Sequence, residues 1–460
     1  MNNDTIAAVA TSLSESTIGI VRISGDEAIN IVDKIFIDKN GEHSLKKYAS
    51  HTIHYGFIIV DGKMIDEVMV SVMKAPKTFT REDVVEINCH GGVFVCKSVL
   101  EAVLNNGARL AAPGEFTKRA FLNGRIDLSK AEAVMDIISS ESKAGLDNSL
   151  KHLNGSLYSK IKKSREEILY EIAFIESALD DPEHISLEGY TDKLVSKCEA
   201  FKKEADELIA TFKTGKILKE GIKTVIVGKP NVGKSSLLNV LTGEERAIVT
   251  DIAGTTRDTI EERVLIGDVC LKLIDTAGIR NTEDVVENIG VSRAKNSARE
   301  ADLILFMLDL SSEFDKEDLE IYDYIKDKKH YVLLNKTDEE NAADVEKIKS
   351  TFSLSKDVFL ISCKDLTGIS DVKRKINEDF LRGTLKTDNE LVITNVRQLN
   401  ELKTVSSSLD LVKDSIEKGL SEDFYSVDLM NAYEAYGRII GEETDDDLID
   451  EIFSKFCMGK

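Results

Sequence analysis

The sequence predicts a multidomain α/β protein in which a doubly wound, mostly parallel sheet is inserted into a helical domain. Strand patterns separated by helical segments recur between residues 221 and 382. On either side of that region the chain is rich in Ala, Leu, Lys and Glu and has few strand signals. A further region with short strands lies N-terminal to the helical and inserted domains. A length of 460 residues is sufficient for such an arrangement.

Residues 1–118 are expected to form the first α/β domain. Runs rich in Val and Ile predict strands over Gly19–Ser24, Ile53–Val60 and Glu67–Met73. Apolar residues at helical spacing predict a helix over Val93–Asn105. This mixture of short strands and helices is typical of an independent α/β unit.

Residues 119–220 are expected to form the first part of the helical domain. A short helix over Glu115–Leu122 leads into it, and Ser129 with Glu132 has the spacing of a capping box that opens the next helix. The second part covers the end of the chain, because periodic apolar residues return there. The segments concerned are residues 383–460, with helices over Leu399–Ile416 and Asp423–Ile440 and a last helix capped by Thr444.

The inserted domain is expected over residues 221–382. Its strands are short apolar runs separated by helical spacers, which favours a Ras-like, doubly wound parallel sheet. The predicted strands are Thr224–Val227, Val269–Ile274, Leu303–Leu308, Tyr331–Leu334 and Val358–Ile361.

The charge balance restricts the ligands that this chain can hold alone. It has 82 acidic and 60 basic residues, for a net charge of −22, whereas affinity for nucleic acid depends on Lys and Arg. If RNA is a substrate, a partner is expected to supply much of the binding. Six scattered cysteines without a CxxC pair indicate reduced thiols, and no apolar run is long enough to span a bilayer. We therefore expect a cytoplasmic protein without a membrane span.

A phosphate-binding loop lies between the first strand of the inserted domain and a helix. Gly228–Ser235 fits GxxxxGK[ST] in the context that this motif requires. The backbone amides are expected to surround the phosphates, Lys234 to reach the β- and γ-phosphates, and Ser235 to bind magnesium. A chance Gly-rich turn is disfavoured because three further motifs follow in order. The residues assigned here are Asn231, Val232, Gly233, Lys234, Ser235 and Ser236.

Those three motifs predict that the nucleotide is GTP. The first, the DxxG motif that begins at Asp275, follows an apolar strand and is placed to hold the magnesium shell and the γ-phosphate. The second, the NKxD motif, ends in Asp338, which can accept two hydrogen bonds from guanine that adenine cannot offer. The third stands where related enzymes carry Ser-Ala-Lys, and its Cys is a mild departure. In order they are Asp275, Thr276, Ala277 and Gly278; Asn335, Lys336, Thr337 and Asp338; and Ser362, Cys363 and Lys364.

The segment Gly254–Asp258, with sequence GTTRD, lies where a loop must supply a magnesium-binding Thr, and Thr256 is the better candidate. Ras-like enzymes place a water-orienting Gln directly after the DxxG motif, but this chain has Ile279 there. Hydrolysis is therefore either very slow or uses other groups. Arg257 and Arg280 are candidates for a charge-supplying arginine, although such residues more often make structural contacts.

Motifs outside the inserted domain carry a resemblance to a known family. Together with the nucleotide motifs they resemble the MnmE (TrmE) family of tRNA-modification GTPases over nearly the whole chain, and GTTRD resembles the TrmE–Era branch. One departure is residues 11–17, where the family usually has a loop with Pro and Gly. The resembling segments are residues 3–8, 19–25, 80–86, 90–92, 112–124 and the terminal Cys457-Met458-Gly459-Lys460.

The resemblance implies that the first domain dimerises and binds a tetrahydrofolate derivative, in the 5-formyl or 5,10-methylene form. Its matched contacts are Arg22, Glu86, Arg125 and Lys460. Taken alone, Arg22 and Glu86 would be ordinary charges at strand ends. The resemblance also implies a catalytic role for Cys457, which otherwise reads as part of a frayed terminus.

For hydrolysis, the resemblance implies that Glu287 orients the water and that a potassium ion replaces the arginine. The alternative for Glu287 is a solvated side chain in an acidic loop. The potassium ligands would be Asn231, Thr250, Ile252 and Thr255. The loop that closes over the ion when two nucleotide domains meet is Thr250, Asp251, Ile252, Ala253, Gly254 and Thr255.

The implied function is modification of tRNA by a homodimer that works with an FAD-containing partner resembling MnmG (GidA), as a heterotetramer. The pair would install an aminomethyl or carboxymethylaminomethyl group at the 5-position of the wobble uridine. The alternative is a ribosome-assembly GTPase of the Era-like type, which shares GTTRD. Such proteins lack the folate-like first domain and the terminal CxGK.

Overall fold

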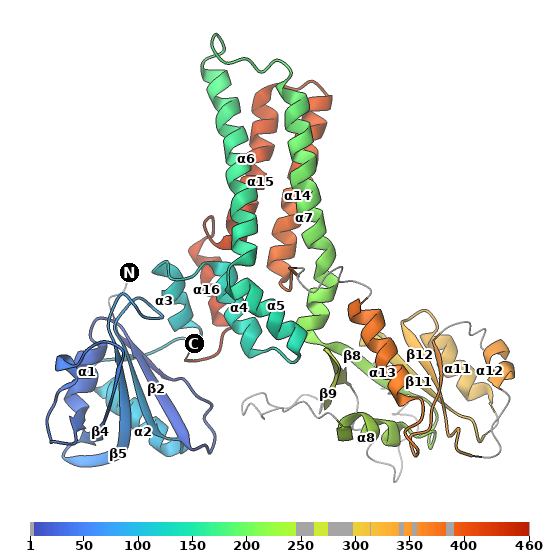
Figure 1. The fold of residues 1–460 in the computed structure, drawn as a ribbon, viewed down its shortest axis with the longest axis horizontal. Coiled ribbons are helices and arrows are strands. Elements are labelled where there is room, and N and C mark those ends of the chain that lie inside the picture. Colours follow the sequence, from blue (N-terminus) through green and yellow to red (C-terminus); the bar gives the residue numbers. More distant parts are fainter. Residues whose placement is uncertain are drawn as a thin grey trace.

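The computed structural model describes residues 4–244, 262–274, 298–312, 314–339, 345–351, 357–382 and 391–459. In these residues, two α/β parts flank a tall bundle of helices (Figure 1). No helix in the described ranges combines the length and apolar character that crossing a membrane requires. The predicted α/β architecture with an inserted doubly wound sheet is confirmed.

The N-terminal part is built on a sheet whose described strands follow the order β3-β4-β5-β6-β2-β1-β7. Neighbouring strands are antiparallel except β1 and β7. Helices α1 and α2 pack on the sheet and share one apolar core with it. The bounds are β1 Ile6–Val9, β2 Ile18–Ser24, α1 Ala28–Ile35, β3 Phe36–Asp38, β4 Thr52–Val60, β5 Lys63–Met73, β6 Val84–His90, α2 Val93–Asn105 and β7 Arg109–Leu110.

The helical domain is assembled from two distant parts of the chain. Its long helices α6, α7, α14 and α15 share one core, to which both parts contribute (Figure 1). Short helices α3, α4, α5 and α16 lie at the base of this bundle. The bounds are α3 Glu115–Leu122, α4 Leu128–Ile138, α5 Lys143–Leu153, α6 Ser156–Asp180, α7 Tyr190–Glu220, α14 Val396–Glu417, α15 Glu422–Ile440 and α16 Asp446–Ser454.

Two predicted helix caps are wrong. Asp127, not Ser129, is the N-cap of α4, and its carboxylate accepts a hydrogen bond from the Lys130 amide. Ser129 lies inside the helix, and its hydroxyl donates to Asp127. Likewise Asp445, not Thr444, occupies the cap position of α16. In both cases the N-cap position is occupied by an Asp within two residues of the predicted cap.

The inserted domain has the predicted doubly wound sheet, in the order β13-β12-β11-β8-β10-β9, with only β9 antiparallel to its described neighbour. Alternate residues of the central strands feed two cores, one on each face, which is why these strands are apolar throughout. The bounds are β8 Ile222–Val227, α8 Lys234–Glu244, β9 Glu262–Ile266, β10 Val269–Leu273, β11 Leu303–Asp309, α11 Lys316–Ile325, β12 His330–Asn335, α12 Val345–Thr351, β13 Val358–Leu360 and α13 Ile369–Asn377.

Candidate functional site

The loop between β8 and α8 has the shape of a phosphate cradle. Gly228, Asn231 and Gly233 have φ angles of 152°, 64° and 101°. A Cβ on Gly233 would lie 2.2 Å from the Asn335 amide nitrogen, and one on Gly228 would lie 2.4 Å from the Met307 carbonyl oxygen. Neighbouring strands therefore require glycine at both positions. The loop leads into the N-terminus of α8, where the direction of the helix dipole and the amides of the first turn favour an anion.

The ammonium group of Lys234 lies over this loop. It donates to the carbonyl oxygens of Gly228 and Lys229, each at 2.6 Å. Burial lowers the pKa of Lys234 from its ordinary value, so nearby negative charge would stabilise the ammonium form. Lys229 is anchored in turn by the carboxylates of Asp315 and Asp318, at 3.0 and 2.7 Å. No sequence motif indicates this second anchor.

Asn335, at the end of β12, joins the two ends of the nucleotide site. Its side chain is buried, donating to the Val232 carbonyl oxygen at 2.8 Å and accepting from the Cys363 amide at 3.2 Å. The first bond reaches the phosphate loop and the second reaches the Ser-Cys-Lys loop. The predicted motifs from three parts of the chain therefore meet around one side chain.

Asp338 provides the negative group expected for guanine. Its carboxylate accepts from the Ser362 hydroxyl at 2.8 Å and lies 3.6 Å from the Lys364 ammonium. The Ser362 hydrogen bond lowers the pKa of Asp338, so the carboxylate is ionised near neutral pH. Lys336, with φ of 69°, forms an ion pair of 2.6 Å with Asp309 at the end of β11. These contacts hold the loop in place through groups of the protein itself.

The remaining residues of these motifs have supporting positions. Cys363 contributes its backbone amide, while its side chain packs against the core of the sheet, where burial raises its pKa to about 11. The departure from Ser-Ala-Lys is therefore accommodated by packing. The Thr337 hydroxyl donates to the Ile361 carbonyl oxygen at 3.1 Å. Ser235 and Ser236 lie in the first turn of α8.

Several predicted site residues lie outside the described residues. They comprise the loop Thr250, Asp251, Ile252, Ala253, Gly254 and Thr255; Thr256; the motif Asp275, Thr276, Ala277 and Gly278; Glu287; and Lys460.

A second candidate site lies where the C-terminal tail meets the N-terminal sheet. Arg22 on β2 and Glu86 on β6 are register partners, and their side chains form an ion pair of 2.8 Å. Arg22 also donates from Nη1 to the carbonyl oxygen of Gly459 at 3.1 Å. Gly459 is buried with φ of 81°, and a Cβ there would lie 2.4 Å from the Val9 carbonyl oxygen. The tail therefore contacts the sheet closely.

Gly114, before α3, holds the preceding part of the tail. Its amide donates to the carbonyl oxygen of Cys457 at 3.2 Å, and a Cβ on it would lie 2.5 Å from the Phe453 carbonyl oxygen. This role of Gly114 was not predicted, although the Pro113-Gly114 pair is a signal for a turn at this position. The Cys457 side chain is exposed. Arg125 is exposed as well, and its side chain forms no hydrogen bond or ion pair with any residue of the described ranges. Direct contacts thus join Arg22, Glu86 and the tail, and the Arg125 side chain takes part in none of them.

Comparison with known proteins covers the whole chain. Residues 5–125 match the family described as GTP-binding protein TrmE N-terminus, and residues 128–457 match the MnmE helical domain. A tRNA modification GTPase MnmE of Lachnoclostridium phytofermentans is 54% identical over 460 residues, covering 100% of both chains. Proteins with the same name are 48% identical in Alkaliphilus oremlandii, covering 100% of this chain and 99% of that one, and 46% identical in Bacillus subtilis, covering 99% and 100%. With its phosphate loop and guanine loops, the chain belongs to the MnmE family of tRNA modification GTPases, which hydrolyse GTP in tRNA modification.

Proposed function

We propose that this chain is a homodimeric, potassium-stimulated GTPase that modifies the wobble uridine of tRNA together with an FAD-containing partner resembling MnmG. The product would carry an aminomethyl or carboxymethylaminomethyl group at the 5-position of that base. The observation that carries the proposal is the contact between the Arg22 guanidinium and Gly459, which brings the exposed Cys457 to the N-terminal domain. The match of residues 5–125 to the TrmE N-terminus favours this function over ribosome assembly.

The N-terminal domain would hold a tetrahydrofolate derivative, which supplies a one-carbon unit when bound. Arg22 and Glu86 would contact it from the sheet, Lys460 from the tail, and Arg125 from the turn after α3. The donor chemistry at Arg22 fits such a ligand: Nε and Nη1 are bonded to Glu86 and Gly459, while Nη2 has no hydrogen-bond partner in the described residues. Its side chain is about one-fifth exposed, at 22%, so Nη2 can reach a carbonyl or carboxylate group.

The nucleotide domain would bind magnesium through Ser235 and Thr256. Potassium would be bound by Asn231 together with Thr250, Ile252 and Thr255, and Glu287 would orient the attacking water. Two observations support an unusual mechanism: Ile279 cannot position water, and Asn231 is exposed on the phosphate loop in a left-handed conformation. A monovalent cation between the phosphates would stabilise the developing negative charge.

Two experiments test the hydrolysis mechanism. One is the substitution Glu287→Ala, and the other compares the rate of GTP hydrolysis in potassium with the rate in sodium. The variant should bind GTP normally but lose at least about a hundredfold in rate, as expected when a group that activates water is removed. The unmodified protein should hydrolyse GTP much faster in potassium than in sodium. Rates measured by phosphate release that are equal in both salts would exclude the proposed ion site, and a normal rate in the variant would exclude Glu287.

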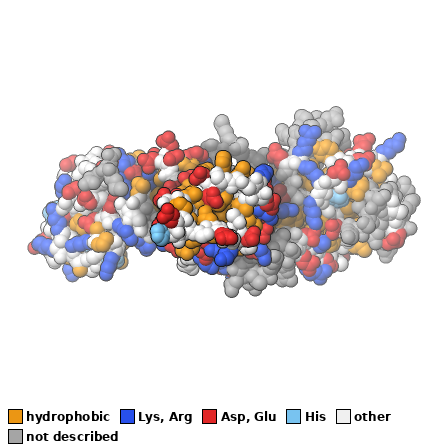
Figure 2. All heavy atoms as spheres, turned by 90° about the horizontal axis from the view of Figure 1, so that it is seen from above, with side chains coloured by type: hydrophobic (Ala, Val, Ile, Leu, Met, Phe, Trp, Pro, Cys, Tyr) orange, Lys and Arg blue, Asp and Glu red, His pale blue; other side chains and the backbone are white. Residues whose placement is uncertain are grey.

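The acidic charge of the chain supports the proposal of a partner that binds tRNA. Seen from the bundle tip, Lys and Arg side chains are scattered among Asp and Glu on this face and do not form one continuous basic surface (Figure 2). The net charge of −22 also opposes tRNA binding. We therefore assign much of the tRNA contact to the FAD-containing protein.

The modification itself is tested by nucleoside analysis of tRNA from cells whose gene is deleted and then complemented. The full chain should restore the modified wobble uridine. A chain lacking residues 457–460 should hydrolyse GTP at the normal rate but restore none of the modified nucleoside. Full restoration by the shortened chain would exclude the tail from the chemistry, and an unchanged nucleoside profile in the deletion strain would exclude the proposed function.

A further inference from the structure

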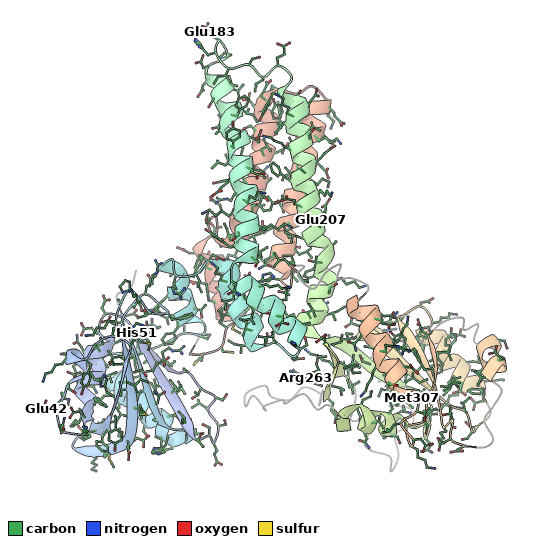
Figure 3. All side chains as sticks on the ribbon, in the orientation of Figure 1. Glu42, His51, Glu183, Glu207, Arg263 and Met307 are labelled. Atoms are coloured by element: carbon green, nitrogen blue, oxygen red, sulfur yellow. The ribbon has the colours of Figure 1, made fainter. Side chains whose placement is uncertain are left out.

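Glu141 lies where the nucleotide domain meets the base of the helical bundle. It stands in the turn between α4 and α5, directly before Ser142, the N-cap of α5. Two basic side chains of the nucleotide domain approach its carboxylate. Arg263 on β9 forms an ion pair with Oε1 through Nη1, and the Lys272 ammonium on β10 lies 3.8 Å from the same oxygen. Figure 3 shows Arg263 at this junction, below the bundle.

The positive charges of Arg263 and Lys272 repel each other, and the Glu141 carboxylate offsets this repulsion from the neighbouring domain. Arg263 and Lys272 are direct register partners on the antiparallel β9–β10 hairpin. Like charges in such a pair destabilise a hairpin, so a carboxylate that contacts both removes an unfavourable interaction. The side chains of Glu141 and Lys272 are only 16% and 19% exposed, so water screens their contact less than it screens a surface ion pair. The Arg263 side chain is more open to solvent, at 36%.

The hairpin connects the segments that are expected to respond to the nucleotide. β9 begins shortly after Thr256, and β10 ends at Leu273, just before Asp275. β10 also pairs with β8, the strand that leads into the phosphate loop. A shift of either segment that depends on the γ-phosphate would therefore act on the hairpin to which Glu141 is attached.

On its other side, Glu141 follows a helix that is tied firmly into the helical domain. The carboxylate of Glu132 on α4 pairs with Arg397 at the start of α14, at 2.9 Å. The carboxylate of Asp136 pairs with Lys219 at the end of α7, at 2.8 Å. Because α4 is held at both points, a displacement at its C-terminal end would move it as a unit with its neighbours.

Helix α4 also packs directly on the helix that carries the tail. Leu128 and Ala131 of α4 share a buried cluster with Phe453 and Phe456. The chain then continues through Cys457 to Gly459, whose carbonyl oxygen contacts Arg22. A continuous series of packed or paired groups thus runs from the β9–β10 hairpin to the tail.

We propose that Glu141 is a positioning residue that couples the nucleotide state of the β9–β10 hairpin to α4, to α16 and to the Cys457 tail. The Glu141 carboxylate holds the β9–β10 hairpin against the helical domain. A movement of the segments that respond to the γ-phosphate therefore alters the packing of α4 on α16. The contacts of Glu141 do not depend on the proposed function; only the chemical consequence at the tail rests on it.

Hydrogen exchange measured on the full-length protein with GDP and with a non-hydrolysable GTP analogue tests this coupling. In the unmodified chain, the change of nucleotide should alter amide exchange in β9, β10, α4 and α16. Glu141→Gln should keep the change in the hairpin but lose most of it in α4 and α16. Arg263→Gln should have the same effect, and the double variant should be no worse than either single variant, because both substitutions remove one interaction.

Glu199→Gln is the matched control, because Glu199 pairs with Lys413 at 2.7 Å across α7 and α14, away from the nucleotide domain. It should leave the nucleotide-dependent differences unchanged. A Glu141→Gln protein that retains the difference in α4 and α16, or an unmodified protein that shows none there, would overturn the inference. Thermal unfolding of each variant separates lost coupling from lost stability.

The nucleoside assay separates this inference from the proposed function. In one outcome, Glu141→Gln loses the nucleotide-dependent hydrogen exchange in α4 and α16, but cells that carry the wild-type chain lack the modified uridine. The coupling then stands and the proposed function fails. If modification occurs normally and exchange in α4 does not depend on Glu141, the proposed function stands and the coupling fails.

Discussion

The nucleotide site and the tail site are constructed in different ways. In the nucleotide site, loops at the ends of β8, β12 and β13 converge, and the buried side chain of Asn335 bonds to two of them. In the tail site, Arg22 from the first sheet meets Gly459 at the other end of the chain through one hydrogen bond of 3.1 Å. The first site is framed by a buried sheet, whereas the second depends on the docking of a short segment after α16.

This difference indicates which site can change without unfolding a domain. The nucleotide loops are anchored by strands that are buried on both faces, and moving them would expose apolar core. Within the described residues, two hydrogen bonds hold the tail: one from the Gly114 amide, contributing about 0.5–1.5 kcal/mol, and one from the charged Arg22 side chain, contributing about 1.5–3 kcal/mol. Segments near a terminus separate readily when few contacts hold them. We therefore expect the tail to undock before the nucleotide loops rearrange.

Asp338→Asn should give the largest effect and should be confined to the nucleotide site. Replacing the carboxylate should weaken the two hydrogen bonds that Asp338 is predicted to accept from guanine, so affinity for GTP should fall by about a hundredfold or more. The measurement is titration with fluorescent GTP, and xanthosine triphosphate, which has a carbonyl group where guanine has an amino group, should bind the variant better than GTP does. If Asp338→Asn binds GTP normally, Asp338 does not read the base.

Arg22→Ala should have a smaller effect, confined to the tail site. It removes the contact to Gly459 and leaves Glu86 without its partner, at a cost of about 1–3 kcal/mol in the free energy of unfolding of the N-terminal domain. The rate at which a thiol reagent modifies Cys457 should rise, while GTP affinity should not change. Arg22→Lys is the control that keeps the positive charge. Unchanged Cys457 reactivity in Arg22→Ala would show that the tail is held elsewhere.

The smallest expected effect concerns His152, at the point where the chain leaves the nucleotide domain. Its Nε2 lies 2.9 Å from the Val392 carbonyl oxygen, and burial lowers its pKa. The unfolded chain therefore binds a proton more readily, so the stability due to the neutral ring is complete above the ordinary pKa of about 6.5 and is lost as pH falls below it.

In urea unfolding between pH 5 and pH 8, this contribution cannot exceed about 1.4 kcal/mol per pH unit, the limit for one proton. His152→Gln keeps a donor for Val392 and should flatten the fall in stability on the acidic side. An identical pH profile for the variant would show that other groups control it.

Local motifs allowed the nucleotide site to be predicted, because Lys234, Asn335 and Asp338 each follow an apolar strand in a recognisable order. Apolar runs and helical spacing also allowed several strands and the helices α2, α3, α14 and α15 to be predicted, whereas α1 and the strands β1, β3, β6, β7 and β9 were not. The caps of α4 and α16 could not, because an Asp competes for each position and Glu132 is engaged by Arg397, far away in the sequence. The tail contact to Gly114 and the Lys229 anchor depend on tertiary packing in the same way.

The chain enters and leaves the nucleotide domain at neighbouring points. It enters through α7, and it returns along residues 391–395, where a Cβ on Gly215 of α7 would lie only 2.0 Å from the Ile393 carbonyl oxygen. Asn148 and Thr211 bond the returning backbone to the bundle. Domains whose ends are close can be inserted into a host without disturbing its core. A short linker could therefore replace the whole GTPase domain without opening the core of the helical bundle.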